Sequence, residues 1–264
     1  MNDVSGEYQS KPLRPNEESL REFWGYKNSG AFSLRENGFT ASGISASVID
    51  SNHSTLDGII VHGAGISQLI ETITPDVSLK RMSVSTPKDM LWAIRKSIDT
   101  HVSVINISLG TRADKTRGTN EEQMAFAYYG QLLEAAHASG IVAVTASGYR
   151  HDRADDSYGF FSNTVVVGGI TQKGQFIESN DEQRIDIYAP GEIEIPVRGY
   201  KRVVPESHSA AAPYVSAACC AIAQVVGRDP EAIRRVLYST AQVVDGKRIL
   251  DMTSLTQELL RLSR

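Results

Sequence analysis

Three side chains whose types suit acyl transfer stand at the ends of predicted secondary-structure elements. Asp50 closes an apolar stretch that predicts a strand, and His62 opens a helical pattern. Ser209 opens a long run of small residues that predicts another helix. A serine hydroxyl becomes a nucleophile when an imidazole accepts its proton and a buried carboxylate orients that imidazole. The three residues therefore form a candidate catalytic triad, although each type alone is common as a cap or turn residue.

Strands and helices are predicted to alternate along the chain. Strands are expected at residues 44–50, 79–84, 102–109, 141–145 and 165–170, with shorter extended segments at 184–188, 192–197 and 201–205. Helices are expected around residues 66–73, 91–98, 124–136, 209–226, 229–240 and 255–262. This alternation is typical of an α/β fold with a doubly wound, mostly parallel sheet and helices on both faces. Such sheets collect functional residues at the carboxyl ends of their strands.

The composition is that of a globular protein and excludes several classes of function. Hydrophobic residues make up 41% and charged residues 22% of the 264 residues, which excludes a wholly disordered chain. The net charge of −4 gives no general attraction to nucleic acid or to anionic membranes. No apolar run approaches the roughly 18 residues of a membrane span, and the polar N-terminus is not a secretory signal. We therefore expect a cytoplasmic protein, with export by a signal-independent route left open.

The chain is expected to form one catalytic domain behind a short arm. Residues 1–37 are mixed in character and predict an irregular N-terminal arm with one short helix near residues 17–24. Residues 38–264 contain no linker, repeat or low-complexity tract and predict a single domain. Cys219 and Cys220 have neither the number nor the spacing of a disulfide or zinc framework, so we expect them to be core thiols.

Several stretches of the sequence agree in content and order with one family of known proteins. They are 38–50, 75–84, Val-Ile-Asn-Ile-Ser-Leu-Gly at 104–110, Ala-Pro-Gly at 189–191 and Ser-Ala-Ala-Ala-Pro-Tyr-Val at 209–215. These stretches resemble the subtilases, the subtilisin-like serine peptidases, whose triad also has the chain order Asp, His, Ser. The resemblance covers about residues 38–245. It implies a subtilisin-like fold and a serine peptidase that needs no cofactor.

The resemblance also assigns a role to each candidate residue. Asp50 would orient His62, which would act as general base and then as general acid for the nucleophile Ser209. A protein or peptide substrate would bind as an extended strand beside backbone groups of the chain. The substrate-binding residues would be Ser108, Leu109, Gly110, Ala146, Ser147 and Gly148. No metal site is expected, because the loop that carries calcium in the family is shortened after the His62 helix.

The expected oxyanion hole departs from the family's pattern. The backbone N–H of Ser209 would supply one donor, but Tyr149 occupies the position of the family's asparagine. Loss of one such donor costs about 10²–10³ in turnover. The hydroxyl of Tyr149 or the ring of His151 could replace it. His208, next to the nucleophile, is expected to be a bystander in catalysis.

Two alternatives use the same residues, and two others are disfavoured. A pseudoprotease of this fold would bind a peptide or partner protein without cleaving it, and acyl transfer to an amine would use the same groups as hydrolysis. A dinucleotide site is disfavoured because Gln68 stands where a third glycine is needed. A metal hydrolase is disfavoured because the sequence has no His-x-x-x-His spacing. The sequence therefore predicts a serine endopeptidase acting on a selected protein or peptide.

Overall fold

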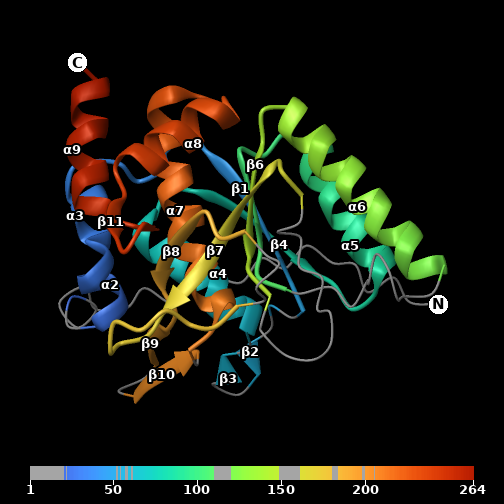
Figure 1. The fold of residues 1–264 in the computed structure, drawn as a ribbon, viewed down its shortest axis with the longest axis horizontal. Helices are drawn as coiled ribbons and strands as arrows, with labels where there is room; N and C mark the ends of the chain where they lie inside the picture. Colours follow the sequence, from blue (N-terminus) through green and yellow to red (C-terminus); the bar gives the residue numbers. More distant parts are fainter. Residues whose placement is uncertain are drawn as a thin grey trace.

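The computed structural model of the chain contains a central sheet flanked by helices (Figure 1). It describes residues 21, 23–51, 53, 55–56, 59–60, 62–109, 120–148, 161–179, 184–197, 200–204 and 206–264. The strands are β1 (Ser45–Asp50), β2 (Thr55–Leu56), β3 (Ile59–Ile60), β4 (Ser78–Ser83), β5 (Val104–Ile107), β6 (Val142–Ala146), β7 (Thr164–Ile170), β8 (Ile187–Pro190), β9 (Ile193–Val197), β10 (Tyr200–Val204), β11 (Gln242–Val244) and β12 (Lys247–Ile249). The helices are α2 (Trp24–Ser29), α3 (Ala31–Glu36), α4 (His62–Ile73), α5 (Pro87–Asp99), α6 (Asn120–Ala138), α7 (His208–Val226), α8 (Pro230–Ser239) and α9 (Met252–Leu262).

The central sheet has eight strands in the order β11-β12-β8-β7-β6-β5-β1-β4. The pairs from β8 to β4 are all parallel, and only β11 joins its neighbour in the antiparallel direction among these strands. The predicted doubly wound, mostly parallel sheet is confirmed. The strand order reverses at β1, because β4 pairs with one side of it and β5 with the other. Ligands of doubly wound sheets bind beside such a reversal, at the carboxyl ends of the strands.

Helices cover both faces of the sheet, and each face has its own apolar core. In Figure 1 the pair α5 and α6 lies on one face, and α4, α7, α8 and α9 lie on the other. Alternate residues of a strand face opposite cores. Val48 and Val104 belong to the core around α7, while Ile49 and Ile105 belong to the core under α5 and α6. Because each face of the sheet has its own core, β1 and β5 are buried along nearly their whole length.

Helix α7 runs through the centre of the larger core. It packs on β5, β6, β7 and β8 and also contacts α4, α8 and α9. Its alanine, serine and cysteine side chains are small, which lets these neighbours approach closely. By length and composition alone α7 could cross a membrane, but most of it is buried inside the fold, as expected for a core helix. Cys219 and Cys220 are buried free thiols in this helix, which confirms their predicted place in the core.

The N-terminal segment differs from the prediction. Within the expected irregular arm, helices α2 and α3 are regular, and Tyr26 and Leu34 are buried in the same core as α7. Each helix has six residues, too few for an apolar period to show in the sequence. Gly30, with a φ of 69°, joins the two helices in the left-handed region that glycine tolerates. The helix expected near residues 17–24 lies largely outside the described residues.

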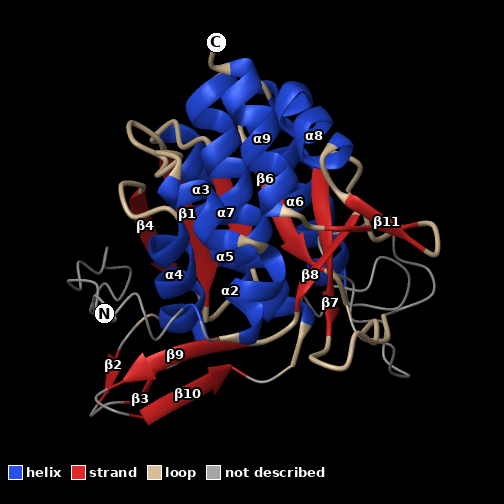
Figure 2. Cartoon of the chain, turned by 90° about the vertical axis from the view of Figure 1, so that its left-hand side faces the viewer, coloured by secondary structure: helices blue, strands red, loops and turns tan. Residues whose placement is uncertain are grey.

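The other differences concern short strands. The extended segment expected at 184–188 begins only at Ile187, as β8. Just before it, the N–H of Asp186 donates to the carbonyl of Val166 in β7, and the Asp186 carboxylate accepts from the N–H of Val166. The hairpins β2–β3 and β11–β12 have strands of two or three residues and were not predicted from the sequence. Hairpins β2–β3 and β9–β10 lie at the same end of the molecule (Figure 2).

Candidate active site

The ends of three neighbouring strands bring the candidate residues to one edge of the sheet. Strands β1, β5 and β6 are parallel, and Ile107 of β5 lies between its partners Ile49 of β1 and Thr145 of β6. The next residue of each strand is Asp50, Ser108 or Ala146. These three residues therefore lie side by side at the carboxyl edge, next to the reversal of strand order.

The buried carboxylate of Asp50 binds the imidazole of His62. Both carboxylate oxygens lie 2.9 Å from Nδ1 of His62. The backbone N–H and the hydroxyl of Ser51 donate to Oδ1 of Asp50 at 2.7 and 3.2 Å. An ionised carboxylate can only accept, so Nδ1 carries a proton and Nε2 of the neutral ring is an acceptor. A general base that takes a proton through Nε2 needs this tautomer.

The first residue of α4, His62, has a buried ring edge and an accessible one. Its side chain is 35% exposed while that of Asp50 is 0% exposed, so the far edge of the ring can meet a substrate. Burial disfavours the charged ring, but the hydrogen bond and the charge of Asp50 outweigh this effect and raise the pKa of His62 above 6.5. The imidazolium that forms during proton transfer is therefore stabilised.

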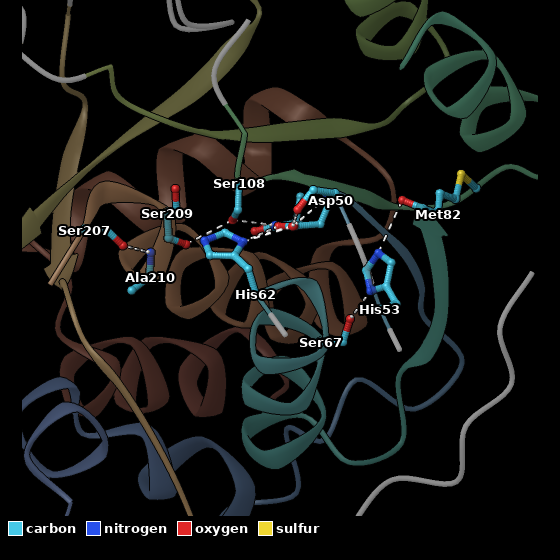
Figure 3. A network of polar contacts seen from close by, with 11 residues as sticks. Asp50, His53, His62, Ser67, Met82, Ser108, Ser207, Ser209 and Ala210 are labelled. Atoms are coloured by element: carbon cyan, nitrogen blue, oxygen red, sulfur yellow. Dashed lines mark hydrogen bonds and ion pairs between the residues drawn. The ribbon is translucent and has the colours of Figure 1, made fainter. Parts of the chain in front are cut away.

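Ser209 lies in the first turn of α7 but does not cap that helix. The N-cap is Ser207, whose hydroxyl accepts from the N–H of Ala210 at 3.1 Å. Ser209 therefore lacks the commonest structural role of a serine at a helix start. In Figure 3 the His62 ring lies between Asp50 and Ser209. Among the described residues, the His62 ring bonds to Asp50 and not to Ser209. This is consistent with a catalytic pair, because such contacts are often longer in a free enzyme than in its substrate complex.

The structure describes some of the predicted oxyanion and substrate-binding residues. The first N–H groups of α7 have no partner within the helix, which makes the N–H of Ser209 a candidate oxyanion donor. Leu109 follows β5, and Ala146, Ser147 and Gly148 lie at the end of the adjacent β6. The positions of the other predicted residues, Tyr149, His151 and Gly110, lie outside the described residues.

A second histidine near Asp50 has a structural role. His53 is 1% exposed. Its Nε2 donates to the carbonyl oxygen of Met82 at 3.3 Å, and its Nδ1 accepts from the hydroxyl of Ser67 at 3.2 Å (Figure 3). Burial lowers its pKa. Since both ring nitrogens are engaged inside the fold, His53 joins α4 to β4 and is not a candidate base.

The carbonyl of Ser209 has a partner outside its own helix because of Pro213. In an α-helix the N–H of residue 213 would bond to the carbonyl of residue 209, but proline has no N–H. The hydroxyl of Ser108 donates to that carbonyl instead, at 3.0 Å. A side chain after β5 thus replaces the missing helical bond and ties the main chain of Ser209 to the edge of the sheet.

Two buried polar residues that the sequence analysis did not single out extend this contact. The amide nitrogen of Asn106 donates to the Ser108 hydroxyl at 2.9 Å, and its amide oxygen accepts from the Ser216 hydroxyl at 2.8 Å. Asn106 is 1% exposed and Ser216 is 0% exposed. Buried amides need partners, so an asparagine in the middle of an apolar strand is the signal that could have revealed this network.

The replacement of the helical bond by Ser108 can be measured. We expect Ser108→Ala to lower the free energy of unfolding by about 1–3 kcal/mol, because the part-buried Ser209 carbonyl and the buried Asn106 amide both lose a partner. In a Pro213→Ala background the N–H at position 213 can bond to that carbonyl, so Ser108→Ala should cost less. Urea unfolding of the wild type, the two single variants and the double variant gives the coupling free energy between the two positions. Equal costs in both backgrounds would contradict the compensation.

Comparison with known sequences supports the predicted family. The model of the Subtilase family matches residues 42–258. A thermophilic serine proteinase of Bacillus sp. (strain AK1) is 27% identical over 171 residues. The match covers 64% of this chain and 40% of that protein, so the chain spans less than half the length of this relative.

Solved structures with the same fold agree with this result. A lanthipeptide protease has a TM-score of 0.72 at 16% identity, covering 92% of this chain and 96% of its own. The nisin leader peptidase NisP from Lactococcus lactis has a TM-score of 0.66 at 19% identity, covering 89% and 93%. At these identities the likeness shows the subtilisin-like fold. Because the family model spans most of the sequence, including Asp50, His62 and Ser209, the chain belongs to the Subtilase family.

Proposed function

We propose that the chain is a serine endopeptidase that uses Asp50, His62 and Ser209 to cleave peptide bonds. The observation that carries this proposal is the bidentate contact of the buried Asp50 carboxylate with Nδ1 of His62. It leaves Nε2 as an acceptor on the exposed side of the ring, where Ser209 lies in the first turn of α7 without a capping role. A nucleophile, a base and a buried orienting carboxylate are the groups that acyl transfer needs.

The proposed reaction assigns each proton to a named atom. Oγ of Ser209 attacks the peptide carbonyl carbon while Nε2 of His62 takes the hydroxyl proton. The N–H of Ser209 donates to the oxyanion, with Tyr149 as the proposed second donor. Nε2 then gives its proton to the departing amine, and the C–N bond breaks to leave an acyl enzyme. Water then attacks the ester carbonyl while the same Nε2 takes its proton, and Nε2 returns that proton to Oγ of Ser209 as the ester bond breaks and the acid product leaves.

The proposed substrate is a selected protein or peptide bound in an extended conformation. The residues after β5 lie at the sheet edge beside the end of β6, and their backbone groups are proposed to pair with the substrate as an added strand. The proposed substrate-binding residues Ala146, Ser147 and Gly148 have small side chains, which suits a large substrate side chain beside them. Two similar structures are named for peptide processing, a lanthipeptide protease and a nisin leader peptidase. We extend that selectivity to this chain as part of the proposal.

A fluorophosphonate probe tests the proposed function without knowledge of the substrate. The probe should label the purified chain, and Ser209→Ala should abolish labelling, because the probe reacts with an activated serine. Ser139→Ala is the matched control, since this exposed serine follows α6 at the opposite end of β6 and should leave labelling unchanged. A folded chain that is not labelled, or a Ser209→Ala variant that is labelled equally, contradicts the proposal.

A further inference from the structure

His208 is buried directly before Ser209, and both of its ring nitrogens are engaged. It is the first residue of α7 and 0% exposed. Nδ1 accepts from the N–H of Gly169 at 3.0 Å, and Nε2 lies 3.1 Å from the carbonyl oxygen of Glu178. Because a carbonyl oxygen only accepts, Nε2 carries the proton and the neutral ring has a defined tautomer. Burial lowers the pKa of His208 more than the Glu178 carbonyl raises it, which keeps the ring neutral.

These contacts join the start of α7 to two strand ends. Gly169 lies near the end of β7, and Glu178 follows the turn after that strand. After β8, the carbonyl of Gly191 accepts from the N–H of Ser207 at 2.7 Å. A Cβ at Gly169 would lie 2.6 Å from Ile177 and 3.0 Å from the Ser207 carbonyl oxygen, so glycine is needed for this approach. The two residues before Ser209 are therefore held against the ends of β7 and β8 by close contacts.

We propose that His208 is a positioning residue that fixes Ser209 through the bond between its Nδ1 and the N–H of Gly169. The inference rests on the proposed function, in which Ser209 is the nucleophile. The buried N–H of Gly169 needs an acceptor, and the ring supplies it from the residue next to Ser209. The contact thereby sets the place of the Ser209 hydroxyl and N–H relative to His62. Small displacements of reacting groups have large effects on rate.

A purely space-filling role makes a different demand on the side chain. A ring that only fills a cavity needs the right volume, and no particular nitrogen matters. A positioning role needs an acceptor at the place of Nδ1. Two amide substitutions separate the ring nitrogens, because the side-chain oxygen of asparagine matches the reach of Nδ1 and the side-chain nitrogen of glutamine matches that of Nε2.

The test compares the rates at which a fluorophosphonate probe inactivates the wild type, His208→Asn and His208→Gln. We expect the maximal inactivation rate of His208→Gln to fall by about tenfold or more, with the half-saturating probe concentration unchanged. His208→Asn should stay within about threefold of the wild type, because it keeps the acceptor for Gly169. Thermal unfolding of the three proteins shows whether the rates merely follow stability.

Each outcome decides the inference. Slow inactivation of His208→Gln, with His208→Asn near the wild-type rate at similar unfolding midpoints, supports it. Equal rates in all three proteins, equal losses in both variants, or losses that follow stability overturn it. If neither variant folds, nitrogen NMR of the folded wild type decides, because a Nδ1–H tautomer or a charged ring at neutral pH contradicts the Gly169 contact. A wild type that is not labelled instead contradicts the proposed function on which the inference rests.

Discussion

Replacement of His62 by alanine is expected to lower kcat/KM by about 10⁴–10⁶. Ser209 would lose the acceptor for its proton, and the leaving amine would lose its donor. The binding groups at the ends of β5 and β6 would remain, so the loss should fall on kcat. Hydrolysis of a fluorogenic peptide that the wild type cleaves, followed under single-turnover conditions, measures the effect.

The matched control for this experiment is His137→Ala. His137 lies in the last turn of α6, where its Nε2 contacts Glu231 at 3.0 Å, and it has no contact with the triad. We expect this variant to keep the wild-type rate. If His62→Ala retained its rate while folded, the assigned base would be wrong.

Asp50→Asn is expected to lower kcat by about 10⁴ while the fold is kept. The amide oxygen of the new side chain can accept from the N–H of Ser51, as the carboxylate does. Its NH₂ group then faces Nδ1 of His62 and donates to it. The ring must adopt the Nε2–H tautomer, in which Nε2 cannot accept the proton of Ser209. Steady-state kinetics beside a matched unfolding curve measure the loss, and an unchanged kcat would show that the carboxylate does not orient the base.

The same substitution should move the acid limb of the pH profile. In the wild type the base must be neutral, so activity falls as the pH drops through the pKa of His62. Because that pKa is raised, the midpoint of this fall lies above pH 6.5. Without the charge and acceptor of Asp50, burial alone acts on the ring and lowers its pKa. The fall of the remaining activity should therefore shift to lower pH in Asp50→Asn. A limb that stays at the wild-type pH would belong to another group.

The sequence was most informative where residues lie on long, regular elements. The strand ending in Asp50 and the helix opening at His62 follow from apolar patterns, and the helix near Ser209 follows from a long run of small residues. All three elements are present. The parallel pairing of β1 with β5 then brings Ser108 beside Asp50. These features depend on local pattern and on the geometry of doubly wound sheets, which sequence reasoning can use.

The contacts that hold Ser209 in place could not be predicted in the same way. Ser108 is 101 positions from Ser209, and Asn106 is 110 positions from Ser216. No local pattern reports a bond between residues so far apart in sequence. From the sequence His208 is only a bystander beside Ser209, and its burial becomes clear only from its contacts with Gly169 and Glu178. Short elements such as α2 and α3 were also missed, because their stability comes from packing.

The two buried thiols of α7, Cys219 and Cys220, can be used to measure how often the packing around that helix opens. Burial raises the pKa of Cys219 to about 12 and raises the pKa of Cys220 well above its ordinary value, so neither is a reactive thiolate in the folded chain. Both thiols are fully buried, so a thiol reagent can modify them only when the packing around α7 opens. The chain contains no other cysteine. The rate of thiol modification therefore follows, without any introduced label, the opening of the packing around the helix that carries Ser209.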